Sequence, residues 1–220
     1  RGDKIPVSTF VDIADGTFPQ GSAAYEKRGI AVDVPEWIPE NCIECNQCSY
    51  VCPHAAIRPV AMTEAEAAKA PEGMQMKDLN QMPGYKFAIV VSAFDCTGCG
   101  SCVNVCPDKV QAITMTGFEA HEDEQKYFDY AVSLEDKEDV IEKFKLTSVK
   151  GSQFRQPLLE FSGACGGCGE TPYAKLITQL FGDRMYIANA TGCSSIWGNS
   201  SPSTPYTTNA KGQGPAWANS

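Results

Sequence analysis

The chain has 220 residues, with 18 Lys and Arg against 27 Asp and Glu, so its formal net charge is −9. Apolar residues make up 43% and charged residues 20%, which is usual for a folded globular protein and excludes intrinsic disorder. An acidic chain repels phosphate backbones, so nucleic acid is not an expected partner. No stretch approaches 18 consecutive apolar residues, and the amino end lacks the layout of a signal peptide. We therefore expect a cytoplasmic protein with no membrane partner. Because the first residue is Arg1 rather than Met, we also expect a fragment of a longer chain.

Residues 1–37 are interpreted as an extension that links to a preceding domain. Two near-identical cysteine segments follow, CIECNQCSYVCP at 42–53 and CTGCGSCVNVCP at 96–107. Each reads C-x2-C-x2-C-x3-C-P, in which three thiolates hold one [4Fe-4S] cluster and the fourth is given to the other cluster. The two copies therefore predict two clusters. Their predicted ligand sets are Cys42, Cys45, Cys48 and Cys106 for one, and Cys96, Cys99, Cys102 and Cys52 for the other.

Zinc is the alternative for these cysteines, but zinc sites use spaced pairs of ligands and often include His. The two histidines, His54 and His121, are expected to be packed or solvated rather than ligands. The region from Ile38 to Met115 resembles the two-cluster bacterial ferredoxin module, so an α+β ferredoxin-like domain is expected over residues 38–150. An insertion at 60–86 separates the two motifs.

Local patterns predict the elements around the motifs. Exit strands are expected at 55–60 and 110–115, and a buried strand at 86–94 leads into the second motif. Thr63 and Glu66 form a capping box, which predicts a short helix over 64–70. Leu134, Val140, Ile141 and Phe144 predict an amphipathic helix that starts at Ser133 and has a solvated acidic face.

The three remaining cysteines lie in a different context. Cys165 and Cys168 form a C-x2-C pair in a glycine-rich loop, which by itself fits a redox dithiol, half a zinc site or half an iron-sulfur site. A helix is predicted to start at Thr171 and end at Gly182, with Leu176, Ile177 and Leu180 on its apolar face. A strand at 185–191 then runs into Cys193. These three thiols are expected to meet, with a fourth ligand beyond residue 220.

The two motifs, followed by SGACGGCGETPY and NATGCSSIWGNSSPSTPYTTN, resemble the pyruvate:ferredoxin oxidoreductase family of thiamine-diphosphate enzymes. The resemblance implies that residues 151–220 are the amino-terminal part of an α/β thiamine-diphosphate-binding domain. It assigns a third [4Fe-4S] cluster to Cys165, Cys168 and Cys193. The contacts that it implies for thiamine diphosphate with Mg2+ are Glu170, Cys193, Gly169 and Gly192.

The function implied by the resemblance is oxidative decarboxylation of pyruvate with CoA to acetyl-CoA and CO2. Electrons would pass singly through the three clusters to ferredoxin or flavodoxin. The resemblance also implies a homodimer and partner domains on the same chain. No catalytic residue is expected within these residues, so the fragment alone would be inactive.

Three alternatives stay open at this point. The first is a free-standing polyferredoxin-type electron carrier, and the second is a relative that acts on another 2-oxoacid. The third is a zinc-stabilised interaction module.

Overall fold

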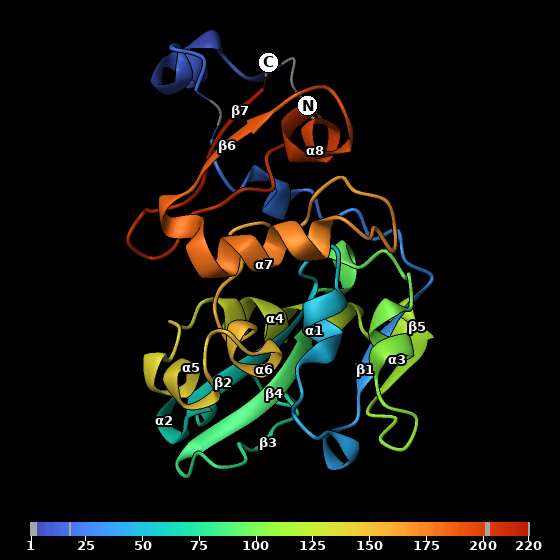
Figure 1. Ribbon diagram of the computed structural model, residues 1–220. Helices are drawn as coiled ribbons and strands as arrows, with labels where there is room; N and C mark the ends of the chain where they lie inside the picture. The colour runs from blue at the N-terminus through green and yellow to red at the C-terminus, as the bar shows by residue number, and fades with distance from the viewer. Residues whose placement is uncertain (1–3, 18, 201–202, 220) are drawn as a thin grey trace.

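The computed structural model describes residues 4–17, 19–200 and 203–219, so residues 1–3, 18, 201–202 and 220 of the predicted segments lie outside the described part. The strands are β1 (Asp33–Trp37), β2 (Ile57–Thr63), β3 (Lys77–Asp78), β4 (Tyr85–Val91), β5 (Ile113–Gly117), β6 (Tyr186–Asn189) and β7 (Ala216–Asn219). The α-helices are α1 (Gln47–Val51), α2 (Glu64–Ala67), α3 (Ser101–Val105), α4 (Gln125–Val132), α5 (Glu138–Phe144), α6 (Val149–Ser152), α7 (Thr171–Phe181) and α8 (Cys193–Ser195). The structure is thus a mixed arrangement of helices and strands (Figure 1).

Each cysteine motif lies between two strands, one leading and one following. The first half of the module runs β1–α1–β2, and the second half runs β4–α3–β5. The leading strand of each half pairs with the following strand of the other: β1 is antiparallel to β5, and β2 is antiparallel to β4. The two halves are therefore interleaved rather than folded as two separate hairpins.

The strand β1 corrects one predicted boundary. Residues 33–37 were expected in the preceding extension, but Trp37 pairs with Ile113 and Asp33 with Gly117. The alternation of polar and apolar residues in DVPEW is masked by its proline, which an edge strand tolerates. The two-cluster module therefore begins before residue 38.

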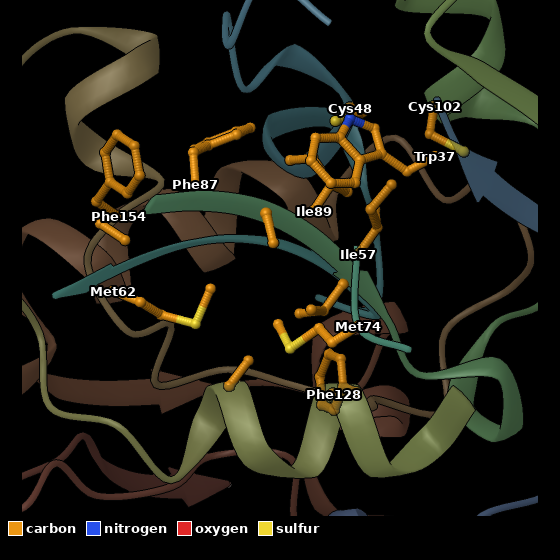
Figure 2. Close-up of a cluster of buried hydrophobic side chains, with 14 of the residues drawn as sticks. Trp37, Cys48, Ile57, Met62, Met74, Phe87, Ile89, Cys102, Phe128 and Phe154 are labelled. Carbon is orange, nitrogen blue, oxygen red and sulfur yellow. The ribbon is translucent and has the colours of Figure 1, made fainter. Parts of the chain in front are cut away.

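The main core lies around β2 and β4. Phe87 on β4 is fully buried and makes edge-to-face contacts with Trp37, at 5.9 Å between ring centroids, and with Phe154, at 6.1 Å. Figure 2 shows Phe128, which comes from α4, across the two strands from Trp37 and Phe87. Aromatic rings from both sides of the sheet thus hold helices and strands together.

The carboxyl-terminal part forms a second, smaller layer. The helix α7 lies between α1 on one side and the sheet of β6 and β7 on the other (Figure 1). β6 and β7 are parallel, with Tyr186 opposite Ala216. Near them, Leu159, Trp197 and Tyr206 form a separate hydrophobic cluster. The helix α7 therefore contacts α1, the helix that follows the first cysteine loop.

Several predicted elements are confirmed. The capping box is present: Thr63 N donates to Glu66 Oε2 at 2.8 Å, and Glu66 N donates to Thr63 Oγ1 at 3.3 Å. The helix that it starts, α2, ends at Ala67 instead of Ala70. The buried strand before the second motif is β4, and the two exit strands are β2 and β5, which begin two to three residues later than predicted.

The helix predicted to start at Ser133 is wrong in its boundaries. Ser133 instead ends α4, where its hydroxyl donates to the Tyr130 carbonyl at 2.6 Å. The next helix, α5, starts at Glu138. The chain between the two helices is not helical, and there the Asp136 carboxylate accepts a hydrogen bond from Gln156 N at 3.1 Å. The apolar stripe itself is confirmed, since Val140 and Ile141 are buried.

The buried face of α7 also differs from the prediction. Its apolar residue Ile177 is 45% exposed, whereas Lys175, Thr178 and Gln179 are buried. These polar side chains have partners: Lys175 and Gln179 donate to backbone carbonyls, and the Thr178 hydroxyl accepts from Leu158 N at 3.1 Å. Hydrogen bonds to neighbouring segments, rather than apolar burial, therefore orient this helix.

Among the described residues, no helix combines the length and the apolar character that crossing a bilayer requires.

Replacing Phe87 by Ala tests the central role of this side chain. Because the ring is fully buried and contacts two other rings, we expect the free energy of unfolding to fall by about 3–5 kcal/mol. Denaturant titration followed by tryptophan fluorescence would measure the change. Tyr25→Ala is the control, since Tyr25 is 89% exposed and its loss is expected to change stability by less than about 0.5 kcal/mol. Equal effects of the two variants would contradict this description of the core.

Candidate metal centres

One cavity gathers thiols from both cysteine motifs. It is lined by Cys42, Cys45, Cys48 and Cys106, together with apolar residues of β4, β5 and the loops. Three of the cysteines come from the first motif and one from the end of the second. This is the first ligand set that the motif spacing predicts.

A second cavity has the complementary composition. Its cysteines are Cys96, Cys99 and Cys102 from the second motif and Cys52 from the first. The interleaved strands explain the exchange, because each motif ends where its following strand leaves for the other half's sheet. The helices α1 and α3, which carry Cys48 and Cys102, contact each other between the cavities.

The loops before α1 and α3 share one backbone conformation. Glu44 and Asn46 have φ of 59° and 60°, and their counterparts Gly98 and Gly100 have 67° and 72°. In both loops this conformation directs an amide toward sulfur: Glu44 N donates to Cys42 Sγ and Gly98 N to Cys96 Sγ, each at 3.4 Å. Left-handed residues therefore turn backbone donors toward the thiols, as a cluster with acceptor sulfurs requires.

The two loops differ in how they are anchored. The Glu44 carboxylate is fully buried; it accepts from Asn80 N at 3.1 Å and pairs with Lys150 at 3.2 Å and Lys77 at 3.8 Å. These contacts tie the first loop to β3 and α6. Gly98 occupies the same place in the second loop, where a Cβ atom would lie 3.1 Å from the Asp33 carbonyl. The second loop is thus held by close backbone contact instead of a side chain.

Burial raises the pKa of four of the thiols that line the two cavities, Cys42 among them. It raises the pKa of Cys96 to about 11 and of Cys102 to about 12, and raises the pKa of Cys48 well above its usual value. Nearby thiols add to this effect; for example, Cys52 acts on Cys96 and Cys102. Without a metal these thiols are protonated at pH 7, so loading a metal centre must release protons.

The pKa of Cys99 shifts in the opposite direction. Burial raises its pKa, but hydrogen bonds from Ser101, Gly167 and Thr97 outweigh that effect and lower it. The donor Gly167 belongs to the Cys165–Cys168 loop.

Four soft thiol donors around each cavity fit iron-sulfur clusters by their chemistry. Among the described residues, no group of three or more His, Cys, Asp or Glu side chains is arranged to hold a single metal ion. The thiols instead border a volume, and a cluster with several metal atoms needs its ligands spread in that way. Each set supplies the four thiolates that a [4Fe-4S] cluster takes.

The third set of thiols is more open. Cys165 and Cys193 are exposed and Cys168 is half-buried. The Trp197 indole, one turn after Cys193, donates to the Glu170 carboxylate at 3.2 Å and lies in the same hydrophobic cluster as Ala164. The segments that carry these cysteines are thus connected, although in the described part of the chain the three thiols do not form a group that could hold a single metal ion. Gly169 and Gly192, two predicted cofactor contacts, border open space.

The Cys165–Cys168 loop lies beside the second cavity. A Cβ atom on Gly167 would lie 3.7 Å from Cys99 Cβ, and one on Gly166 would lie 3.4 Å from Thr97 Oγ1. His54, which lines the second cavity, is 2% exposed and faces the Ser162 carbonyl through Nδ1 at 3.2 Å. The Cys165–Cys168 loop therefore neighbours the Cys96 motif.

Two residues of these sites, Glu44 and Lys175, were missed by sequence reasoning. Glu44 lies within a cysteine motif, and nothing in the sequence indicates that its carboxylate is buried. Lys175 stands within an apolar stretch of α7, and its ammonium is hydrogen-bonded to the Cys52 carbonyl at 3.2 Å. His54 was expected to be packed or solvated, and it is packed; burial lowers its pKa. His121 is packed too, against Thr116 and Glu124.

The fold and the eight thiols define a class of protein. Residues 41–110 match a family described as a 4Fe-4S dicluster domain, and residues 1–31 match a domain of unknown function named EKR. The first match covers both predicted cluster motifs. This part of the chain is a 4Fe-4S dicluster domain.

Similarity to curated proteins extends over the whole chain. It is 60% identical to a pyruvate-flavodoxin oxidoreductase of Enterobacter agglomerans and 60% identical to a pyruvate:ferredoxin oxidoreductase of Moorella thermoacetica, covering 18% and 19% of those proteins. It is also 56% identical to a pyruvate dehydrogenase [NADP(+)] of Cryptosporidium parvum, covering 11%. In each comparison, all of this chain is matched. The chain is therefore homologous, from end to end, to a segment of the pyruvate:ferredoxin or flavodoxin oxidoreductases, and the resemblance indicated by the motifs is confirmed.

The anchoring of the first loop is tested by Glu44→Gln. Because the buried carboxylate accepts an amide hydrogen bond and pairs with two lysines, its neutralisation is expected to cost about 1.5–3 kcal/mol of unfolding free energy. Denaturant titration would measure it. Glu40→Gln, a change at an exposed carboxylate near the same loop, is the control and is expected to be neutral. A neutral Glu44→Gln would show that the carboxylate does not hold the loop.

Proposed function

We propose that this chain is the electron-relay segment of a 2-oxoacid oxidoreductase that converts pyruvate and CoA to acetyl-CoA and CO2. The observation that carries the proposal is the pair of cavities, each lined by three cysteines of one motif and one of the other. End-to-end identity with pyruvate oxidoreductases supports the substrate. The chain spans less than a fifth of the first two of these relatives, so the complete enzyme is proposed to be a longer polypeptide.

Two [4Fe-4S] clusters are proposed for the eight thiols. Cys42, Cys45, Cys48 and Cys106 would hold one, and Cys96, Cys99, Cys102 and Cys52 the other. The amides directed at sulfur are consistent with sites made for a charged cluster. Such clusters accept and release single electrons when bound. The chain's own part is to exclude water from them and to keep them adjacent.

A third cluster is proposed at Cys165, Cys168 and Cys193, with a further ligand from outside these residues. Its loop neighbours Cys99, so the relay order would be third cluster, Cys96 cluster and then Cys42 cluster. This order requires no long step across the protein, because each site borders the next.

Thiamine diphosphate with Mg2+ is proposed to bind near Glu170, Cys193, Gly169 and Gly192, in the first part of a further domain at residues 151–220. Bound thiamine diphosphate supplies an electron sink for the carbanion formed by decarboxylation. Glu170 is held by the Trp197 indole, which orients its carboxylate at the start of α7. The open space beside Gly169 and Gly192 is consistent with a close approach of a cofactor.

Further segments of the polypeptide, or a second subunit of a homodimer, are proposed to cover α7. Tyr173, Ile177 and Phe181 are 68%, 45% and 49% exposed and follow one another at spacings of four residues. Such a stripe lies on one face of a helix and is usually buried. The eleven free cysteines suit a reducing compartment, which is why we propose the cytoplasm.

Ferredoxin or flavodoxin is proposed as the electron acceptor. The relatives named above include flavodoxin, ferredoxin and NADP(+) in their names, so the shared segment is common to proteins named for different acceptors. A free-standing polyferredoxin is the second candidate, favoured only by the dicluster match. It does not account for the similarity over residues 151–220.

The ligand exchange between motifs is tested by two substitutions. Cys52→Ala is expected to damage the cluster of the Cys96 motif, and Cys106→Ala that of the Cys42 motif, because each thiol lines the other motif's cavity. Iron and sulfide analysis with EPR of the dithionite-reduced protein would resolve the two clusters. Native protein is expected to hold about eight iron atoms in these motifs. Damage confined to the motif that carries each substitution would refute the exchange.

The reaction is tested with the complete polypeptide that contains these residues, purified without oxygen. Pyruvate and CoA together are expected to reduce added ferredoxin or flavodoxin, followed by absorbance, with acetyl-CoA formed in step. 2-Oxoglutarate in place of pyruvate is the control for substrate class. Full iron content without pyruvate-dependent reduction would favour a carrier over the enzyme.

A further inference from the structure

Lys175 is a buried cation beside the segment that carries Cys48 and Cys52. Its side chain projects from α7 toward α1 and the residue is 1% exposed. The ammonium donates hydrogen bonds to the carbonyls of Ser49 and Cys52, the latter at 3.2 Å. These two carbonyls lie at the end of α1, which connects Cys48 with Cys52.

The charge of Lys175 has no carboxylate partner. No Asp or Glu oxygen of the described residues lies within 4.0 Å of its ammonium, whereas the more exposed Lys77 and Lys150 both pair with Glu44. Burying an ammonium without a counter-charge costs several kcal/mol. Two carbonyl dipoles offset only part of this cost, so a further negative charge nearby is required for the arrangement to be stable.

The cysteines on either side of the α1 segment are the available counter-charges once they ligate clusters. The ammonium is hydrogen-bonded to the carbonyl of Cys52 itself and to that of Ser49, the residue after Cys48. Cys48 lines one thiol cavity and Cys52 the other, so the ammonium lies beside one ligand of each predicted cluster.

We infer that Lys175 is a buried counter-ion for the two clusters and that it favours their reduced states, most of all at the Cys96 cluster, to which Cys52 is the fourth ligand. The inference rests on the proposed function, since it requires the clusters. Reduction by one electron adds a negative charge to a cluster, and a fixed cation in a water-poor site stabilises that charge with little screening. Lys175 belongs to α7, so the contact of the carboxyl-terminal part with the dicluster domain sets how easily the relay is reduced.

The test is Lys175→Met, which retains most of the stem and removes the charge. At a fixed potential, the ratio of reduced to oxidised Cys96 cluster, which has Cys52 as a ligand, is expected to fall about tenfold, equal to 59 mV for a one-electron couple. The Cys42 cluster, which has Cys48 as a ligand, is expected to change less. EPR-monitored redox titration of the complete polypeptide, purified without oxygen, gives both values. Lys175→Arg retains the charge and is expected to keep the native ratio within about twofold.

Gln179→Met is the matched control for helix position. Gln179 lies one turn further along the same buried face of α7, and its amide donates to the Arg155 carbonyl at 2.8 Å and accepts from Gln153 at 3.0 Å. Its loss disturbs the seating of α7 without changing any charge. The ratio is expected to stay native in this variant. If Gln179→Met and Lys175→Met shift the ratio equally, the inference is overturned, because helix position and not charge would be responsible.

Iron analysis separates the possible failures. Native protein without iron would refute the proposed function itself. Full iron with an unchanged ratio in Lys175→Met would refute only the inference. Should Lys175→Met lose its clusters, Lys175→Gln takes its place, since its amide retains a donor for the two carbonyls. If both neutral variants lose iron, retention by Lys175→Arg supports the counter-ion and loss by all three shows a purely steric role.

Discussion

The exchange of strands between the two halves of the dicluster domain is the constraint on which the sites depend. Because β1 pairs with β5 and β4 with β2, the end of each cysteine motif is carried toward the other half. Cys52 and Cys106 are therefore placed by sheet pairing and not by the local loop. The pairing of these two strand pairs thus determines which four thiols border each cavity. The helices α1 and α3, which carry a thiol of each cavity, contact each other.

Near-equivalent loops do not make equivalent sites. Glu44 and Gly98 adopt the same left-handed backbone conformation. The first cavity has beside it the buried Glu44 carboxylate, which pairs with two lysines, whereas the second has Gly98, which lies close to the Asp33 carbonyl. Lys175 adds a further asymmetry, since it contacts the Cys52 carbonyl directly. In the proposed relay, charges placed differently around the two similar cavities would give an electron a different energy on each cluster, and such a difference is what makes transfer directional.

Much of this arrangement was predictable from local patterns. The C-x2-C-x2-C-x3-C-P repeats, the Thr63–Glu66 capping box and the strand before Cys96 each depend on residues close together in sequence. The buried face of α7 was not predictable, because sequence periodicity identifies the apolar face of a helix as the buried one. Lys175 and Gln179 are buried instead because they donate hydrogen bonds to carbonyls of residues far away in the chain. Glu44 was missed for the same reason: its partners Lys77 and Lys150 come from other elements.

The inverted amphipathicity of α7 connects fold and function. This helix buries its polar face against neighbouring segments of the chain and leaves Tyr173, Ile177 and Phe181 exposed, so the proposed partner on the apolar side would be a different neighbour. The polar contacts are directional hydrogen bonds, which specify position more sharply than apolar contact does. Accurate placement is needed on that side, because a buried charge changes an electron's energy steeply with distance. The apolar side needs only burial, and this division suits a helix that joins a relay to the part of the protein where the electrons originate.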